Sequence, residues 1–169
     1  VAAINVPPCD NSAMDGYAVR SADCVAGVPT PVAGVIYAGA MPELLQPATA
    51  QRIFTGAPVP QGADAVVIQE DVAVESEAIV INAGVTVKTG ENIRRAGEDI
   101  SAGDILFAAG HRVCSRDIGL LASIGIDKIH VTVPLRVGLL CTGDELLEPG
   151  DAPQAGKIYN SNRYLLSAL

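Results

Sequence analysis

Short apolar runs, interrupted by turn-forming residues, characterise the first half of the chain. The runs at residues 66–68, 78–81 and 85–87 are rich in β-branched side chains and are bounded by Gly, Pro, Asn or Asp. β-branched residues fit the pleated surface of a sheet, and the bounding residues favour turns. The pattern predicts a strand at each run and a β-rich domain over residues 1–95.

After residue 96 the spacing of apolar residues becomes that of a helix. Ile118, Leu121 and Ala122 recur at three- and four-residue intervals, so they lie on one face of a helix. Ser115 is expected to cap this helix, because a serine side chain can accept a free N–H group of the first turn. Residues 128–133 alternate between polar and apolar side chains, which predicts a strand.

The last part of the chain resembles the beginning of an α/β domain. Residues 137–141 form a continuous apolar run, which is typical of a strand buried on both faces of a parallel sheet. Asn160 or Ser161 is expected to open a helix with leucines on one face. Because a βαβ unit needs a second strand after its helix, we expect the chain to be a fragment cut inside a third domain.

Composition agrees with a fold built from strands and turns. The 169 residues are 49% hydrophobic but only 4% aromatic, so small aliphatic side chains must fill the core. Charged residues make up 18%, below the roughly 25% of an average soluble domain. The 17 glycines and 11 prolines favour strands and turns over long helices.

The net charge narrows the choice of partners. A formal charge of −8 argues against nucleic acid or an anionic membrane, which are held mainly by clustered Lys and Arg. To bind an anion, the protein would need additional positive charge at the site, and a divalent metal ion is the simplest source. No apolar run approaches the ~18 residues of a membrane span. The four cysteines include no CxxC pair, so we expect cytosolic thiols and a cytoplasmic protein.

Residues 10–20 read DNSAMDGYAVR and are too polar to be core. Asp15 and Gly16 have two interpretations. An Asp-Gly pair supplies the left-handed backbone of a tight turn. Asp15 can also act as a ligand presented by that turn.

The loop TGAPVPQGAD at residues 55–64 offers a second candidate site. Free N–H groups near Gly56 and Ala57, helped by the Thr55 hydroxyl, would make a small concavity for an anion. The alternative is a plain rigid turn between strands.

Two acidic segments are further candidates. In RRAGEDI, residues 94–100, the charges form either a solvated, salt-bridged turn or a site in which Arg orients an oxyanion and a carboxylate holds a metal. In TGDE, residues 142–145, the carboxylates follow the apolar run, and ligands of open α/β sheets bind at the carboxyl ends of strands. The alternative for TGDE is a loop with solvated carboxylates. His111 and Cys114 are interpreted as structural, because neither completes a metal-binding or catalytic spacing.

Taken in order, the motifs NSAMDGYAVR, IFTGAPVPQGADAVV, NIRRAGEDI, VGLLCTGDELLEPG and GKIYNSNRYLL resemble the molybdopterin molybdenumtransferase family, MoeA, whose animal relative is gephyrin. The resemblance implies a mainly β fold with some α. Residues 1–95 would form the β-rich second domain of the family, and residues 96–134 the returning half of its elongated first domain. Residues 135–169 would be the truncated start of its molybdopterin-binding α/β domain.

The resemblance also implies a reaction, the Mg²⁺-dependent insertion of molybdate into adenylylated molybdopterin with release of AMP. Site residues carried over from the family motifs are Asp15, Thr55, Asp99 and Glu145 as catalytic groups. Asp15 and Asp99 would ligate the metal. Molybdopterin would contact a further set, comprising Thr142, Gly143, Asp144, Glu145 and Ser161.

In the family, the carboxylate of the MDGYA motif faces the third domain of the other subunit of a homodimer. The resemblance therefore implies a homodimer and an isolated fragment without activity. The alternative is a non-enzymatic scaffold of the gephyrin type, and this fragment by itself would then be a folded β module.

Overall fold

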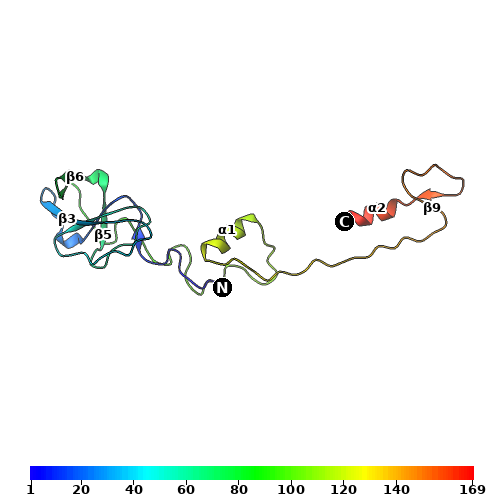
Figure 1. The fold of residues 1–169 in the computed structure, drawn as a ribbon, viewed down its shortest axis with the longest axis horizontal. Helices are drawn as coiled ribbons and strands as arrows, with labels where there is room; N and C mark the ends of the chain where they lie inside the picture. Colours follow the sequence, from blue (N-terminus) through cyan, green and yellow to red (C-terminus); the bar gives the residue numbers. More distant parts are fainter. The chain divides into compact units, whose positions relative to one another are not determined.

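The computed structural model describes residues 1–169, and its contacts divide them into two units, residues 1–127 and residues 128–169. Figure 1 shows strands in the first unit and two helices, α1 (Ser115–Ser123) and α2 (Ser161–Ser167), of which α1 belongs to the first unit. The chain is mainly β, as predicted. The division into three domains at residues 95 and 134 stays a prediction.

The first unit is built on a six-stranded sheet with the strand order β5-β2-β4-β3-β7-β6. The six strands form five neighbouring pairs, of which only β3–β4 is parallel. The strands are β2 (Gly16–Val19), β3 (Pro29–Ile36), β4 (Ala50–Ile53), β5 (Ala65–Ile68), β6 (Val72–Glu75) and β7 (Ala78–Ile81). The strands predicted at residues 66–68 and 78–81 are therefore confirmed.

The centre of the sheet is buried on both faces. All four residues of β2 are buried, and their side chains alternate between two hydrophobic clusters. Tyr17 and Val19 join one cluster, whereas Ala18 joins the other. The burial of β2 holds its N-terminal end, and the residues just before it, in a defined position.

A smaller core lies where the N-terminal segment meets α1. Ala2, Ile100 and Ile124 are buried together in this third cluster. A two-residue pairing, β1 (Asn11–Ser12) with β8 (Ile93–Arg94), runs antiparallel.

The N-cap of helix α1 lies one residue before the predicted capping residue. Its N-cap is Cys114, whose backbone N–H donates to Oδ2 of Asp117 at 2.8 Å. The predicted cap, Ser115, is the first helical residue. The side-chain acceptor comes from Asp117 inside the first turn, so a serine at the cap is not required. His111 contacts the same carboxylate, with 2.7 Å between its Nε2 and Oδ2 of Asp117.

The second unit contains a short parallel pair and a helix. The strands β9 (Leu146–Leu147) and β10 (Ile158–Tyr159) are parallel, and α2 follows β10. Asn160 is the N-cap of α2, and its side-chain oxygen accepts the backbone N–H of Arg163 at 3.2 Å. The predicted helix is therefore confirmed, with Asn160 as the capping residue.

Three predicted strands are wrong. Residues 85–87, 128–133 and 137–141 form no strand. Val85 and Val87 pack at the margin of a core cluster without a pairing partner. Every residue from 131 to 140 is exposed, because the described chain offers this segment no strand to pair with and no face to cover it. No helix of the structure is both long and apolar enough to cross a bilayer.

Candidate functional site

Asp15 and Thr55 form a hydrogen-bonded pair at one end of the six-stranded sheet. Oδ1 of Asp15 accepts hydrogen bonds from the backbone N–H of Thr55 at 2.8 Å and from its hydroxyl Oγ1 at 2.7 Å. Oδ2 of Asp15 has no hydrogen-bond partner in the protein. Two bonds from one neighbour hold the carboxylate in a fixed orientation and leave its second oxygen available to a ligand.

The same contacts keep Asp15 ionised. The backbone N–H and the hydroxyl of Thr55 lower the pKa of Asp15 below its ordinary value, and the positive charge of Arg52 lowers it further. Partial desolvation raises the pKa, but its effect is smaller than that of either hydrogen bond from Thr55. Asp15 is therefore negatively charged at neutral pH.

The register of the sheet brings this pair together. Gly16 on β2 lies opposite Ile53 on β4, so Asp15 precedes β2 at the end where Thr55 follows β4. A Cβ atom at Gly16 would overlap the carbonyl oxygen of Val67 on β5. Gly16 does not have a left-handed backbone, so the tight turn predicted for the Asp-Gly pair is wrong. The glycine is needed because two strands approach closely, and this positions Asp15.

Arg52 completes the surroundings of the pair. Its guanidinium carbon lies 5.0 Å from the ring centroid of Tyr17 and 4.9 Å from that of Phe54. Nη1 of Arg52 donates to the carbonyl oxygen of Gly16 at 3.3 Å, and Nη2 donates to Oε1 of Gln69 at 2.6 Å. These contacts fix a cation beside the carboxylate.

The anion-binding concavity predicted in the loop after β4 does not form. The N–H of Gly56 donates to the carbonyl oxygen of Ser12 at 2.9 Å, and that of Ala57 donates to the carbonyl oxygen of Phe54 at 2.9 Å. Both amides are therefore used by the protein's own backbone. The loop anchors β1 and presents Thr55 to Asp15, and in this respect it is the rigid turn of the alternative interpretation.

The RRAGEDI segment is a turn with ion pairs at the surface. Nη2 of Arg94 lies 2.5 Å from Oδ1 of Asp99, and its Nε lies 3.2 Å from Oε1 of Glu98. Arg95 pairs with Asp10 at 2.5 Å. All five side chains are substantially exposed, so these pairs add little to stability. One of the two predicted interpretations, the salt-bridged turn, describes this geometry.

No hydrogen bond or ion pair joins Asp99 to Asp15 or Thr55. No group of three or more His, Cys, Asp or Glu side chains is arranged to hold a metal ion. Asp15 and Asp99 each keep one carboxylate oxygen without a partner. Such single oxygens fit Mg²⁺, which often takes only one or two carboxylates and completes its shell with water and substrate phosphates. The metal-binding role of both residues stays a prediction.

The other predicted site residues belong to the second unit and are all exposed: Thr142, Gly143, Asp144, Glu145 and Ser161. Asp144 and Glu145 form a turn directly before β9. They were expected to follow a buried strand, and this placement is wrong because residues 137–141 form none. The backbone oxygen of Glu145 accepts the N–H of Ile158 at 2.8 Å, and the backbone oxygen of Asp144 accepts Nζ of Lys157. The binding roles of these residues stay predictions.

Sequence reasoning missed the residues around Arg52. Arg52 lies on β4 and Phe54 directly follows the strand, two residues on, so an extended chain puts both on one face, and the register places Tyr17 opposite Arg52. The i, i+2 spacing in QRIF was the available signal. The pairing with Tyr17 and the contact with Gln69 depend on the sheet and leave no mark in the sequence.

Comparison with known proteins places the chain in a family. The family model described as "MoeA N-terminal region (domain I and II)" matches residues 1–125. Molybdopterin molybdenumtransferase of Haemophilus influenzae is 42% identical over 170 residues, covering 100% of this chain and 42% of the relative. Molybdopterin molybdenumtransferase 2 of Mycobacterium tuberculosis is 43% identical, covering 99% of this chain and 42% of the relative. The chain thus spans less than half the length of these relatives.

Solved structures give the same result. The crystal structure of a molybdopterin biosynthesis MoeA protein from Pyrococcus horikoshii matches with a TM-score of 0.86 and 34% identity. The match covers 99% of this chain and 44% of that protein. A second structure from the same organism matches with a TM-score of 0.83 and 32% identity.

Proposed function

This chain belongs to the MoeA family, and we propose that the whole protein is a molybdopterin molybdenumtransferase acting in molybdenum cofactor biosynthesis. Two relatives with more than 40% identity over almost the whole chain carry that name, which supports the transferase activity. The finer proposal is the insertion of molybdate into adenylylated molybdopterin, with Mg²⁺ and release of AMP, by a homodimer.

The observation that carries this proposal is the Asp15–Thr55 pair. Thr55 holds Oδ1 of Asp15 by two hydrogen bonds, and Oδ2 of Asp15 remains free. A carboxylate that is ionised and oriented in advance binds a hard cation without a further ordering cost. Asp15 is therefore the first choice for a metal ligand, and Asp99 offers a second oxygen.

Charge explains why a metal is needed. The chain carries a formal charge of −8, and molybdate and an adenylylated pterin are anions, so carboxylates at the site would repel them. Bound Mg²⁺ would supply Lewis-acid polarisation of the phosphoanhydride. The protein's own residues would orient the metal ligand: Thr55 holds Asp15, and Arg52 offsets its charge. Asp144 and Glu145 would contact the molybdopterin.

The test is Asp15→Asn in the full-length protein, which keeps the shape of the side chain and removes its charge. We expect a loss of activity of about 100-fold or more, the usual size for a group that stabilises transition-state charge. Activity is measured as restoration of an apo-molybdoenzyme by molybdate and Mg²⁺. The Mg²⁺ concentration for half-maximal activity should rise as well.

Asp127→Asn is the matched control, because Asp127 is an exposed aspartate without a hydrogen bond or ion pair. This variant should retain the activity of the unmodified protein. If Asp15→Asn retains it too, Asp15 has only a structural role and the proposed site is wrong.

A further inference from the structure

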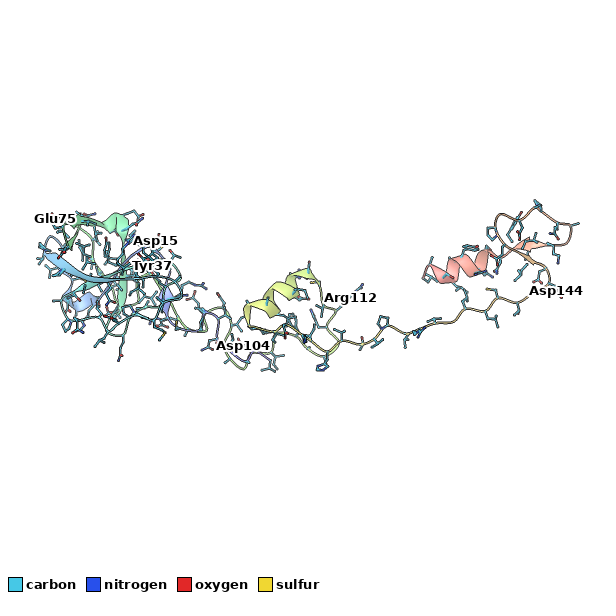
Figure 2. The ribbon with its side chains drawn as sticks, in the orientation of Figure 1. Asp15, Tyr37, Glu75, Asp104, Arg112 and Asp144 are labelled. Atoms are coloured by element: carbon cyan, nitrogen blue, oxygen red, sulfur yellow. The ribbon has the colours of Figure 1, made fainter.

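Half of the aromatic side chains of this protein gather beside the Asp15–Thr55 pair. The chain has four Tyr, two Phe and no Trp. Tyr17, Tyr37 and Phe54 lie together at one end of the sheet, because Tyr37 and Phe54 directly follow the paired residues Ile36 and Ile53 of the parallel strands β3 and β4. In the view of Figure 2, Asp15 and Tyr37 are labelled close together in the first unit.

These side chains form an ordered stack with Arg52, called here the Tyr37 stack: Tyr37, Phe54, Arg52 and Tyr17. The rings of Tyr37 and Phe54 are nearly parallel, with an interplanar angle of 11° and 5.3 Å between centroids. The guanidinium of Arg52 lies over both Phe54 and Tyr17. Hydrogen bonds from Arg52 to Gly16 and Gln69 hold the guanidinium in place.

One end of the stack is open to solvent. Tyr37 is 62% exposed, whereas Tyr17 is 7% exposed. The Tyr37 hydroxyl makes no hydrogen bond with the protein, so core packing and polar anchoring do not explain its position. An exposed ring held parallel to a second ring presents a flat π surface to a ligand.

The stack also offers positive charge to a ligand. A guanidinium has five N–H donors, and Arg52 uses two of them in hydrogen bonds with the protein. Arg52 is partly exposed, so the remaining donors are available to an anion that approaches the stack.

From these contacts we propose that the Tyr37 stack binds the planar heterocycle of an anionic substrate, with the ring lying on the open face of Tyr37 and its phosphate extending past the edges of Tyr37 and Phe54 toward Arg52. Phe54 directly precedes Thr55, so a ligand on the stack lies next to the Asp15–Thr55 pair. This inference rests on the proposed function, which supplies two substrate heterocycles, a purine and a pterin. Both are flat and both carry phosphate, and the experiment separates them.

The test is a titration of the 169-residue chain with AMP and, separately, with a pterin monophosphate, followed by NMR shifts of Tyr37 and Phe54. Tyr37→Leu should weaken binding of the recognised ligand about fivefold or more, since loss of one stacking ring usually has at least this effect. Tyr37→Phe keeps the ring and should bind within about twofold of the unmodified chain. Adenosine should bind more weakly than AMP, and this difference should shrink at high salt.

Tyr164→Leu is the matched control, because Tyr164 is an exposed tyrosine of the second unit and is 52% exposed. It should bind like the unmodified chain. A response to AMP alone identifies the purine, and a response to the pterin alone identifies the pterin. The inference is overturned if neither ligand shifts these signals up to about 10 mM, a limit that corresponds to negligible affinity. It is also overturned if Tyr37→Leu binds as well as the unmodified chain.

Binding is measured without the transfer reaction, so the two proposals fail separately. Loss of activity in Asp15→Asn together with no ligand on Tyr37 would retain the proposed function and remove this inference. Ligand binding at Tyr37 together with full activity of Asp15→Asn would retain this inference and remove the proposed site.

Discussion

At the scale of single residues, the Asp15–Gly16 pair shows how one dipeptide can carry two different physical constraints. Asp15 is held by Thr55 through one carboxylate oxygen, and Gly16 allows β2 to approach β5. The sequence predicted that both residues matter. It attributed the glycine to backbone conformation, whereas the structure attributes it to the space between two strands.

Replacement of Gly16 tests this explanation. In Gly16→Ala the new Cβ would overlap the carbonyl oxygen of Val67, and a backbone atom cannot move aside as a side chain can. We expect the free energy of unfolding to fall by about 3 kcal/mol, at the upper end of the usual cost of overpacking. Urea unfolding of the chain measures the change.

Gly34→Ala is the matched control in the same sheet. Gly34 lies on β3, its backbone is not left-handed, and a Cβ there would meet no atom within 4 Å. Its stability should stay the same or rise by about 0.5 kcal/mol, because alanine loses less backbone entropy than glycine. An equal loss in both variants would show that close approach at Gly16 is not the cause.

At the scale of elements, the start of α1 depends on one carboxylate. Oδ2 of Asp117 accepts the N–H of Cys114 and contacts Nε2 of His111. The contact with His111, followed by the hydrogen bonds from Cys114, lowers the pKa of Asp117 to about 2. A lowered pKa means that the folded state favours the ionised form, so protonation must weaken the cap.

The resulting pH dependence has a definite sign. The stabilisation from Asp117 is fully present above its ordinary pKa of 3.8 and is lost as the pH falls through about 2. We therefore expect the amides of α1 to lose protection from hydrogen exchange in this window. Asp117→Asn should show the weaker protection already at pH 5, with little further change on acidification.

Asp127→Asn is the control for the acid experiment, because its side chain has no partner to lose. It should follow the unmodified chain throughout. If Asp117→Asn retains full protection of α1 at pH 5, the carboxylate does not stabilise the cap.

Whether a predicted strand forms depends on a neighbouring strand with which it can pair. The runs at 66–68 and 78–81 have neighbouring strands on which to pair, and both form strands. The run at 137–141 is apolar as well, but nothing in the described chain pairs with it. β-propensity measures fit to a sheet that already exists, so it cannot by itself show which runs will find a partner.

At the scale of the whole molecule, the chain consists of two units joined near residue 127. Residues 128–141 lie outside helices and strands, and those from 131 to 140 are all exposed. A protease cuts where the backbone is exposed and unpaired. Trypsin should therefore cut after Lys128 and Arg136 at least about tenfold faster than after Arg52, which lies within β4.

Mass spectrometry of a brief digest measures this order, and products that end at Lys128 or Arg136 should appear before any that end at Arg52. Arg163 is an internal control, because it lies in α2 and is paired with Glu148 at 2.8 Å. Cleavage after Arg52 as early as after Arg136 would contradict the division into two units.

The sequence by itself determined the mainly β character, the two helices and the identity of the motif residues, because these depend on local propensity and on residue type. It was enough to select Asp15 and Thr55 as candidates. It was not enough to show that Thr55 bonds Asp15, that Asp99 is instead paired with Arg94, or that Tyr37 and Arg52 belong to one stack. The Arg94–Asp99 pair is decided by the conformation of one surface turn. The Asp15–Thr55 bond joins residues 40 positions apart, and for it and the stack only the register of the folded sheet decides which residues meet.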